Sequence, residues 1–376
     1  MRPESEEALA GIVRAATGPL RVTGGGTRAL GGPGPGAGPA EVLETGGLTG
    51  VVLYEPASLT LVAKAGTRLD TIEAVLAAER QRLAFEPPRM ERLTGRASGP
   101  TGDPAGASTG TSTLGGVVAA NAAGPRRIQA GAARDALLGV RFVDGRGQVI
   151  RNGGRVMKNV TGYDLVKLMA GSRGTLGVLT EVSFKLQPIP PAAATLILPD
   201  AGAGRAVAAM TAALGSPYDV TGAAYVPGTG TLIRVEGLEA SVDYRAGRLA
   251  VDLAPLGVAV RESEPARVAR LWRDIGEVAA FHDRPGAVWR VSCRPSEGAE
   301  VARRLGGEVV MDWGGGLVWA LWPEGEDIRP RLAGLPGHAT LVRGFGAPAL
   351  PPEPEPVARL SRALKAQFDP RGLFAA

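Results

Sequence analysis

Cysteine and histidine are nearly absent from this chain of 376 residues, which has one cysteine, Cys293, and two histidines, His282 and His338. A lone cysteine excludes an internal disulfide and an iron–sulfur cluster ligated by this chain alone. With so few soft ligands, we expect no zinc site and no other metal site. Any redox chemistry therefore has to come from an organic cofactor or from a partner.

Long apolar runs and dense basic runs are also missing. No stretch approaches the ~20 apolar residues of a membrane-spanning helix, and the first residues are acidic rather than basic and apolar. We therefore expect no transmembrane segment and a cytoplasmic protein. The net charge of +5 comes from arginines scattered among acids, and aromatic residues make up only 5% of the chain. This pattern argues against nucleic acid as a partner.

The balance of residues is that of a globular protein, with 44% hydrophobic and 21% charged residues over a length that suits two domains. Apolar periodicity predicts a helix at residues 1–17 and another at 70–83, where Asp70 can cap the first turn. Two strands joined at residues 144–147 follow, and Asp164 can begin a short helix.

A strand at residues 178–186 alternates apolar and polar side chains and ends at prolines 188, 190 and 191, so we place a domain boundary there. Beyond it the pattern changes to three strand–helix–strand units, which favour a small α+β domain with an antiparallel sheet. The predicted parts are a first domain at 1–190, a second at 191–350, and a C-terminal helical segment at 351–376 that returns to the first.

A glycine triplet follows the first predicted strand, in Val22-Thr23-Gly24-Gly25-Gly26-Thr27. Glycines let backbone N–H groups approach an anion closely, and the Thr27 hydroxyl adds a donor, so the segment can cradle a pyrophosphate. No long helix follows, so this is not the Rossmann fingerprint. A glycine triplet taken alone is more often just a turn.

Two further motifs consist of small and hydroxyl-bearing residues. Residues 110–116, GTSTLGG, lead into VVAANAAG at 117–124, where a large planar ligand can lie against backbone and bond to Asn121. The alternative is a loop before a buried helix. The other motif is VMKNVTGYDL at 156–165, followed by GSRGTLGVLT at 171–180.

The ordered set GGGT, GG-x5-N-x2-G, KN-x2-GYDL and GS-x-GTLGV-x-TE resembles the FAD domain of the vanillyl-alcohol-oxidase, or p-cresol-methylhydroxylase-type, family. The finer resemblance is to the smaller FAD-binding subunit of glycolate oxidase, through residues such as EPP at 86–88, GHAT at 337–340 and FDPRGLF at 368–374. It spans nearly the whole chain, and residues 93–109 match least. The resemblance implies an α+β fold, with a two-part FAD-binding domain and a smaller C-terminal α+β cap domain.

The resemblance also implies a set of FAD-binding residues. On the pyrophosphate it places Gly24, Gly25, Gly26 and Thr27; near the flavin and ribityl chain, Pro87, Gly115, Gly116, Asn121 and Gly124; and near the adenine, the backbone of Gly177 and Val178. Family members that hold FAD covalently do so through His, Cys or Tyr at set places. The glycine loop here has no histidine and Cys293 lies far outside it, so we expect non-covalent FAD.

The catalytic residues stay unassigned, because relatives that oxidise hydroxy acids use histidines and basic residues of the C-terminal domain, which this chain has few of. The ending after FDP also departs from the family. Candidates are His338 as a functional histidine, and Arg290 or Arg343 as partners for a substrate carboxylate. Surface or structural roles are the more common ones for such residues. We expect the nearby tryptophans to pack the second domain or its interface.

The resemblance implies an FAD-binding subunit of a glycolate oxidase or D-2-hydroxy-acid dehydrogenase complex that oxidises glycolate to glyoxylate and passes electrons through flavin to a partner. Its partners would be a larger flavin-binding subunit and an iron–sulfur subunit, which could bring it to the inner face of the membrane. Two alternatives stay open: a self-sufficient FAD-dependent 2-hydroxy-acid oxidase, and a structural subunit with a vestigial flavin site. The sequence leaves the hydroxy acid itself unassigned.

Overall fold

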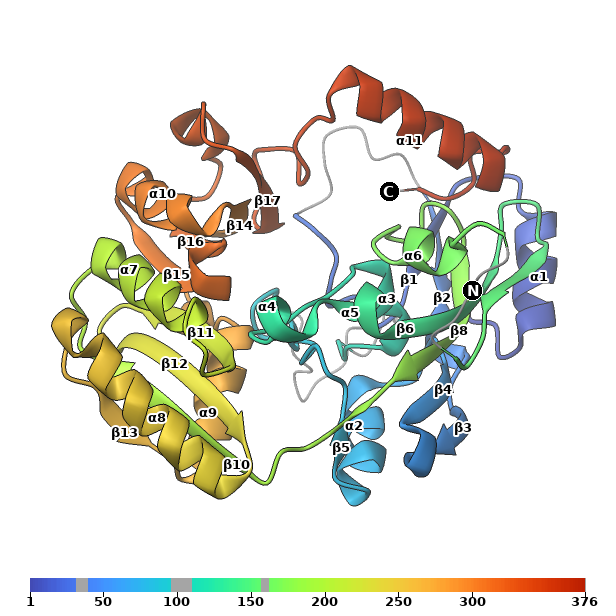
Figure 1. Ribbon diagram of the computed structural model, residues 1–376. Helices are drawn as coiled ribbons and strands as arrows, with labels where there is room; N and C mark the ends of the chain where they lie inside the picture. The colour runs from blue at the N-terminus through green and yellow to red at the C-terminus, as the bar shows by residue number, and fades with distance from the viewer. Residues whose placement is uncertain (32–39, 96–109, 157–161, 376) are drawn as a thin grey trace.

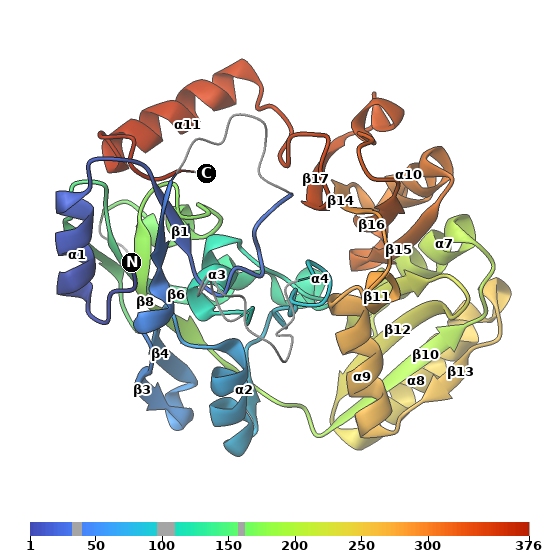
Figure 2. The same ribbon diagram turned by 180° about the vertical axis from the view of Figure 1, so that it is seen from behind.

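Two antiparallel sheets, each with its own helices, make up the protein (Figures 1 and 2). The structure is a computed structural model, and it describes residues 1–31, 40–95, 110–156 and 162–375. Residues near 190 join the two sheets on one side of the molecule, and the chain after residue 343 returns on the other.

The first part contains a five-stranded sheet in the order β3-β4-β8-β6-β7 and a small parallel pair, β1 with β2. Its strands are β1 Leu20–Thr23, β2 Glu41–Glu44, β3 Val51–Glu55, β4 Thr60–Lys64, β5 Gln81–Arg82, β6 Leu137–Val143, β7 Val149–Gly153, β8 Val178–Lys185 and β9 Gln187–Pro188. Its helices are α1 Glu6–Ala15, α2 Leu69–Ala78, α3 Leu114–Ala119, α4 Arg127–Ala130, α5 Ala133–Ala136 and α6 Leu165–Met169.

Local sequence signals in this part are mostly confirmed. Strands β6 and β7 form the predicted hairpin, because the Asp144 carboxylate accepts hydrogen bonds from the backbone N–H groups of Arg146 and Gln148 and so fixes the turn. The Asp164 side chain caps α6, accepting from the Lys167 N–H at 3.1 Å, as the sequence predicts.

The predicted cap of α2 is wrong. The N-cap residue is Arg68, and Asp70 lies inside the first turn, where it pairs with Arg68 instead of capping. The helix also ends at Ala78, so Leu83 packs into the core from the following strand segment. In the sequence, Leu83 continues the apolar pattern of α2, so the pattern predicts a helix that extends to it. In the structure the chain leaves the helix at Arg80, whose φ is 52°, before it reaches Leu83.

The second part is an eight-stranded sheet in the order β13-β10-β12-β11-β15-β16-β14-β17. Its strands are β10 Ala192–Leu198, β11 Val220–Val226, β12 Gly230–Gly237, β13 Val260–Glu262, β14 Ala287–Cys293, β15 Glu308–Asp312, β16 Leu317–Trp322 and β17 Gly337–Arg343. The helices are α7 Ala203–Leu214, α8 Glu239–Leu253, α9 Pro265–Gly276 and α10 Gly298–Leu305. The predicted α+β class and antiparallel second sheet are confirmed.

The two faces of this sheet have different partners. Helices α7, α8 and α10 cover one face over a large apolar core, while α9 lies on the opposite face, toward the first part (Figures 1 and 2). The sequence analysis missed α9, although Glu264 caps it and Val268, Trp272 and Ile275 form its buried stripe. This second face therefore meets the FAD-domain-like half of the chain.

The last helix, α11 Glu355–Phe368, runs from the second sheet back toward the first (Figure 1). The backbone of Leu20 exchanges hydrogen bonds with the C-terminal residues: its N–H donates to Leu373 at 2.6 Å, and its carbonyl accepts from Ala375 at 3.0 Å. Phe374 is 1% exposed. The C-terminus thus packs beside the strand that leads into the glycine triplet.

Candidate flavin site and its interface with the second sheet

The glycine triplet lies directly against the segment 110–116. A side chain at Gly24 would come within 2.5 Å of the Thr113 hydroxyl, and one at Gly25 within 1.6 Å of the Thr111 carbonyl oxygen. The Thr27 hydroxyl lies 3.0 Å from that of Ser112. The structure therefore brings two of the predicted motifs together, and Gly25 is small because backbone fills the space beside it.

Helix α3 follows this contact and begins at the Thr113 cap. Gly115 donates its N–H to the Ala65 carbonyl at 2.7 Å, and a Cβ there would meet Ala65 at 2.9 Å. Gly116 contacts the cap hydroxyl of Thr113 in turn. Gly115 therefore lets the start of α3 pack closely against Ala65, the residue after β4.

The chain crosses itself where residues 85–87 meet residues 121–124. The Gly124 N–H donates to the Phe85 carbonyl at 2.9 Å, and a Cβ on Gly124 would lie 2.0 Å from the Glu86 carbonyl oxygen. Asn121 adopts φ of 46°, and its side-chain oxygen accepts from the Arg134 N–H at 3.0 Å. Of the residues predicted near the flavin, Gly124 makes the contact at this crossing, and Pro87 and Asn121 belong to the two segments that meet there.

Gly177 and Val178, predicted near the adenine, lie elsewhere. Val178 is fully buried in a core with α1 and β1, and Gly177 faces the ring of Phe142 and the carbonyl of Val143. Their backbone is the part that could contact an adenine, and the placement of these two residues near the adenine stays a prediction. The motif residues 157–161 and most of the poorly matched segment, 96–109, lie outside the described residues.

Trp313, at the end of β15, joins the second sheet to the crossing. Its indole N–H donates to the Gly124 carbonyl at 3.0 Å. The guanidinium of Arg290 stacks over the same indole at 5.1 Å, and that of Arg127 lies 5.8 Å from its centroid. As expected, the tryptophans pack the second part and its interface, since Trp319 shares a buried cluster with Trp313.

Several arginine donors near these loops have no acceptor among the described residues. Arg173 and Arg290 make no ion pair there, and the Nε of Arg28 is buried without a partner. Burial is the largest cause that lowers the pKa of Arg28 and of Arg290 to about 10, and the charge of Arg173 contributes to both. The nearby Glu91 carboxylate opposes this effect at Arg28. A Cβ added at Gly174 would lie 3.2 Å from the Cβ of Val22. The loop that contains Arg173 therefore lies beside the strand that leads into the glycine triplet.

The remaining candidates have different surroundings. His338 is exposed on β17 near Arg290, and burial followed by that positive charge lowers its pKa. Arg343 donates to the carbonyls of Leu93, Phe281, Gly286 and Arg284, so its nitrogens already serve the backbone. The ring of His282 bonds to the Glu277 carbonyl, and burial raises the pKa of the Cys293 thiol to about 11.

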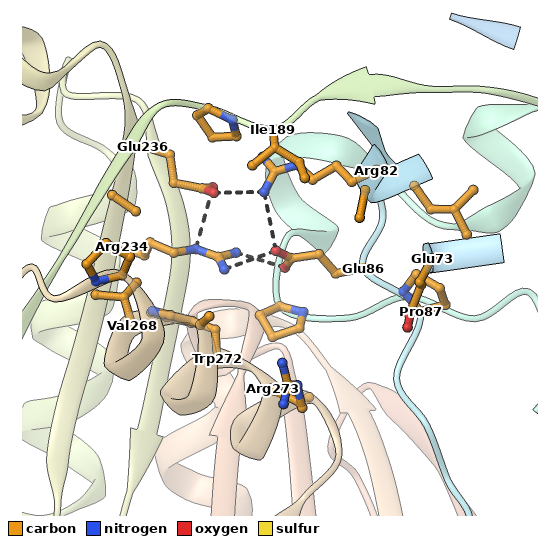
Figure 3. Close-up of a pocket in the computed structure, with 18 of the residues that line it drawn as sticks. Glu73, Arg82, Glu86, Pro87, Ile189, Arg234, Glu236, Val268, Trp272 and Arg273 are labelled. Carbon is orange, nitrogen blue, oxygen red and sulfur yellow. Dashed lines mark hydrogen bonds and ion pairs between the residues drawn. The ribbon is translucent and has the colours of Figure 1, made fainter. Parts of the chain in front are cut away.

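A cleft of about 1350 Å³ opens between α2, residues 82–92, the link at 189–193 and helices α8 and α9. Its wall includes Pro87 and an ion-pair network that crosses from the first part to the second (Figure 3). Arg234 on β12 binds Glu86 through two nitrogens, at 2.8 and 3.0 Å, and Glu236 binds Arg82 at 2.9 Å. The glycine triplet, Arg290 and His338 do not line this cleft.

Comparison with known proteins gives the family. Glycolate oxidase subunit GlcE of Escherichia coli K12 is 36% identical over 327 residues, which are 86% of this chain and 83% of that protein. The chain belongs to the GlcE family. An FAD binding domain family also matches this GlcE-family chain, at residues 1–107 and 95–153.

Other similarities of the GlcE-family chain are shorter or more distant. Glycolate oxidase subunit GlcD of Bacillus subtilis 168 is 44% identical over 86 residues, 23% of this chain and 18% of that protein. A solved structure of alkyldihydroxyacetonephosphate synthase superposes with a TM-score of 0.68 at 16% identity, over all of this chain and 76% of that one. This likeness supports the predicted vanillyl-alcohol-oxidase type of fold and carries nothing further.

The site of this GlcE-family chain fits an anionic cofactor such as FAD. Arg28, Arg173 and Arg290 are buried cations whose pKa values burial lowers, and none of them forms an ion pair among the described residues, although the Glu91 carboxylate partly offsets the effect at Arg28. A bound anion would offset the free energy that it costs to bury these charged guanidinium groups. The sequence analysis missed Arg28 and Arg173, although one follows GGGT and the other stands within GSRGTLGV.

Within 1–31, 40–95, 110–156 and 162–375, no cluster of three or more His, Cys, Asp or Glu side chains is placed to hold a metal ion. In the same part of the chain, no helix has the length and apolar character needed to cross a membrane.

Proposed function

We propose that this chain is an FAD-binding subunit of a glycolate oxidase or D-2-hydroxy-acid dehydrogenase complex, which oxidises glycolate to glyoxylate. The observation that carries the proposal is the likeness to GlcE over most of both chains. The structural support is a set of three buried arginines, Arg28, Arg173 and Arg290, none of which forms an ion pair among the described residues. In this proposal residues 1–190 hold FAD, residues 191–350 cap it, and residues 351–376 tie the cap back to the first part.

FAD, when bound, would supply the hydride acceptor for oxidation at the α-carbon of the hydroxy acid. The backbone of Gly24, Gly25 and Gly26 would hold the pyrophosphate, with Arg28 and Arg173 neutralising its charge. Neither guanidinium forms an ion pair among the described residues, and the Nε of Arg28 has no hydrogen-bond partner there. The proposed binding is non-covalent, since no histidine stands in the glycine loop.

Arg290 is the residue best placed to hold a substrate carboxylate. Stacking on Trp313 fixes the plane of its guanidinium, and a fixed planar fork binds a carboxylate through two parallel hydrogen bonds. His338 shares the same face of the sheet, because Ser292 pairs with it two residues beyond Arg290. Burial and Arg290 keep this imidazole's pKa low, which favours the neutral form that can accept a proton.

The proposed partners are a larger flavin-binding subunit and an iron–sulfur subunit. A reduced flavin needs an outlet for electrons, and the single cysteine of this chain cannot ligate a cluster. Similarity to GlcD over 86 residues is compatible with a flavin-binding partner of related sequence. The competing function is a self-sufficient 2-hydroxy-acid oxidase that reacts without these subunits.

The test is to purify the chain alone and in its co-expressed complex, and to measure flavin content and turnover of glycolate and D-lactate with a dye as electron acceptor. The dye replaces the iron–sulfur subunit, so only the need for the second flavin subunit is measured. We expect both preparations to contain FAD and only the complex to turn over rapidly. Equal turnover by the isolated chain would establish the self-sufficient oxidase instead, and a colourless chain would contradict FAD binding.

A further inference from the structure

One buried ion pair links the second sheet to the crossing that contains Pro87 and Gly124. The guanidinium of Arg234, on β12, binds both carboxylate oxygens of Glu86 (Figure 3). The Arg234 side chain is 4% exposed and that of Glu86 is 24% exposed. A two-point contact of this kind fixes orientation as well as distance.

Arg234 is itself held in a single position. Its Nε donates to the Thr221 hydroxyl at 3.2 Å, and its guanidinium stacks on Trp272 of α9 at 4.5 Å. Glu236, two residues along the strand, binds Arg82 and Arg126 of the first part. Burial alone would raise the pKa of Glu236, but Arg234 together with these cations lowers it to about 2, so Glu236 stays ionised at neutral pH.

Glu86 stands at a strained point of the first part. Its backbone has φ of 45°, a conformation that residues other than glycine rarely adopt, and its carbonyl oxygen presses against Gly124. Such a conformation persists only where the surroundings impose it. Arg234 supplies that constraint on the Glu86 side chain, and Trp313 holds Gly124 from the same sheet.

We propose that Arg234 and Glu86 are positioning residues through which the second sheet shapes the flavin-facing loop at residues 86–88. The inference rests on the proposed function, because it requires FAD at that loop. It goes beyond that function by making the cap part of the cofactor site: cofactor affinity and the flavin environment then depend on a contact that need not touch the cofactor.

The experiment uses the full chain with the variants Glu86→Gln, Arg234→Lys and Arg234→Met, and the double variant Glu86→Gln/Arg234→Met. Arg284→Met is the matched control, since Arg284 makes an equally two-pronged pair with Glu308 on the solvent side of the same sheet. FAD affinity is measured by titrating apoprotein and following flavin fluorescence. The visible flavin spectrum and the amide exchange of residues 85–88 and 121–127 are recorded for each.

Glu86→Gln and Arg234→Lys are expected to weaken FAD binding about tenfold, because each keeps a polar partner but loses the charged two-point geometry. Amide exchange in both segments should speed up, while Arg284→Met should match the wild type. The double variant should bind FAD no more weakly than Arg234→Met. The single substitution already removes the Arg234–Glu86 pair, so the second substitution has no further contact between them to remove. If Arg234→Met does not fold, Glu86→Gln and Arg234→Lys decide the result.

Folded Glu86→Gln and Arg234→Lys proteins with affinity and spectrum within twofold of wild type would overturn the positioning role and leave the proposed function intact. Additive losses in the double variant would overturn the pairing in the same way. A wild-type chain that binds no FAD would overturn both the proposed function and this inference, so the two failures are distinguishable.

Discussion

Trp313 donates its indole N–H to the carbonyl oxygen of Gly124 at 3.0 Å. A residue that follows β15 is thereby bonded to a loop 189 positions earlier in the chain. Both groups are buried, which makes the bond costly to lose. The contact joins the cap-like sheet to the region where the flavin is proposed to lie.

Replacing Trp313 with Phe should destabilise the protein by about 0.5–1.5 kcal/mol, because the buried Gly124 carbonyl loses the indole donor and keeps only the backbone N–H of Arg127. Urea denaturation of both proteins measures the change. Trp322→Phe is the matched control, since the Trp322 indole bonds to the Glu326 side chain on the outer side of the sheet. Equal effects of the two substitutions would mean that only ring size matters.

Gly25→Ala should cost at least about 2 kcal/mol and also weaken FAD retention, because the new methyl group meets the Thr111 carbonyl at 1.6 Å and one backbone segment has to move. Gly11→Ala is the control. Nothing lies within 4 Å of that position in α1, so it should stabilise the helix by about 0.5–1 kcal/mol. Thermal unfolding and flavin content are the measurements, and full flavin in stable Gly25→Ala protein would contradict the packing argument.

Arg290→Met should raise the KM of the complex for glycolate or D-lactate at least tenfold while FAD is retained, because a carboxylate would lose its two-point partner. Arg331→Met provides the comparison, since Arg331 stacks on Trp322 at 5.0 Å much as Arg290 stacks on Trp313. Steady-state kinetics with a dye acceptor separate KM from kcat. An unchanged KM would remove Arg290 from the proposed site.

Asp312 gives a pH dependence of known sign. Burial, the largest cause, raises its pKa from 3.8 to about 7, so the folded protein binds a proton more tightly than the unfolded chain does. This residue therefore makes stability fall as pH rises from about 4 to about 7, by about 1.4 kcal/mol for each pH unit. Asp312→Asn mimics the neutral form and should lack this decline. Unfolding free energies from pH 4 to 8 test it, and parallel curves for the two proteins would contradict the assignment.

Acid precipitation should release FAD into the supernatant, because the proposed binding rests on charge and backbone contacts. Denaturing acid destroys those contacts but leaves a covalent bond intact. The measurement is flavin fluorescence in the supernatant and on the denatured chain after electrophoresis. Fluorescence that stays with the chain would show a covalent linkage.

Local structure was readable in the sequence where one or two neighbouring residues decide it. The turn at Asp144 and the cap at Asp164 depend on side chains that bond to backbone within four positions. The strand–helix–strand units after residue 191 followed from periodicity for the same reason. The order of the motifs along the chain identified the family. No single motif could do so, because each one alone would also suit an ordinary turn.

Only the tertiary structure decided how distant side chains are used. Arg343 and Arg290 look alike in sequence as arginines on neighbouring strands, yet one donates to four backbone carbonyls and the other stacks on Trp313 without a carboxylate partner among the described residues. Gly25 was predicted to let its backbone approach a pyrophosphate, and the structure adds a second need for glycine there, because the Thr111 carbonyl fills the space beside it.

The pairing of Arg234 with Glu86 lay equally beyond the sequence, because 148 positions separate them and nothing near either residue signals the other. Periodicity and capping report interactions within a turn or a strand, whereas burial and charge pairing depend on which surfaces the completed fold brings together. The sequence by itself thus determined most of the helices and strands, the family and the expected cofactor. The contact between the second sheet and residues 86–88 came from packing alone.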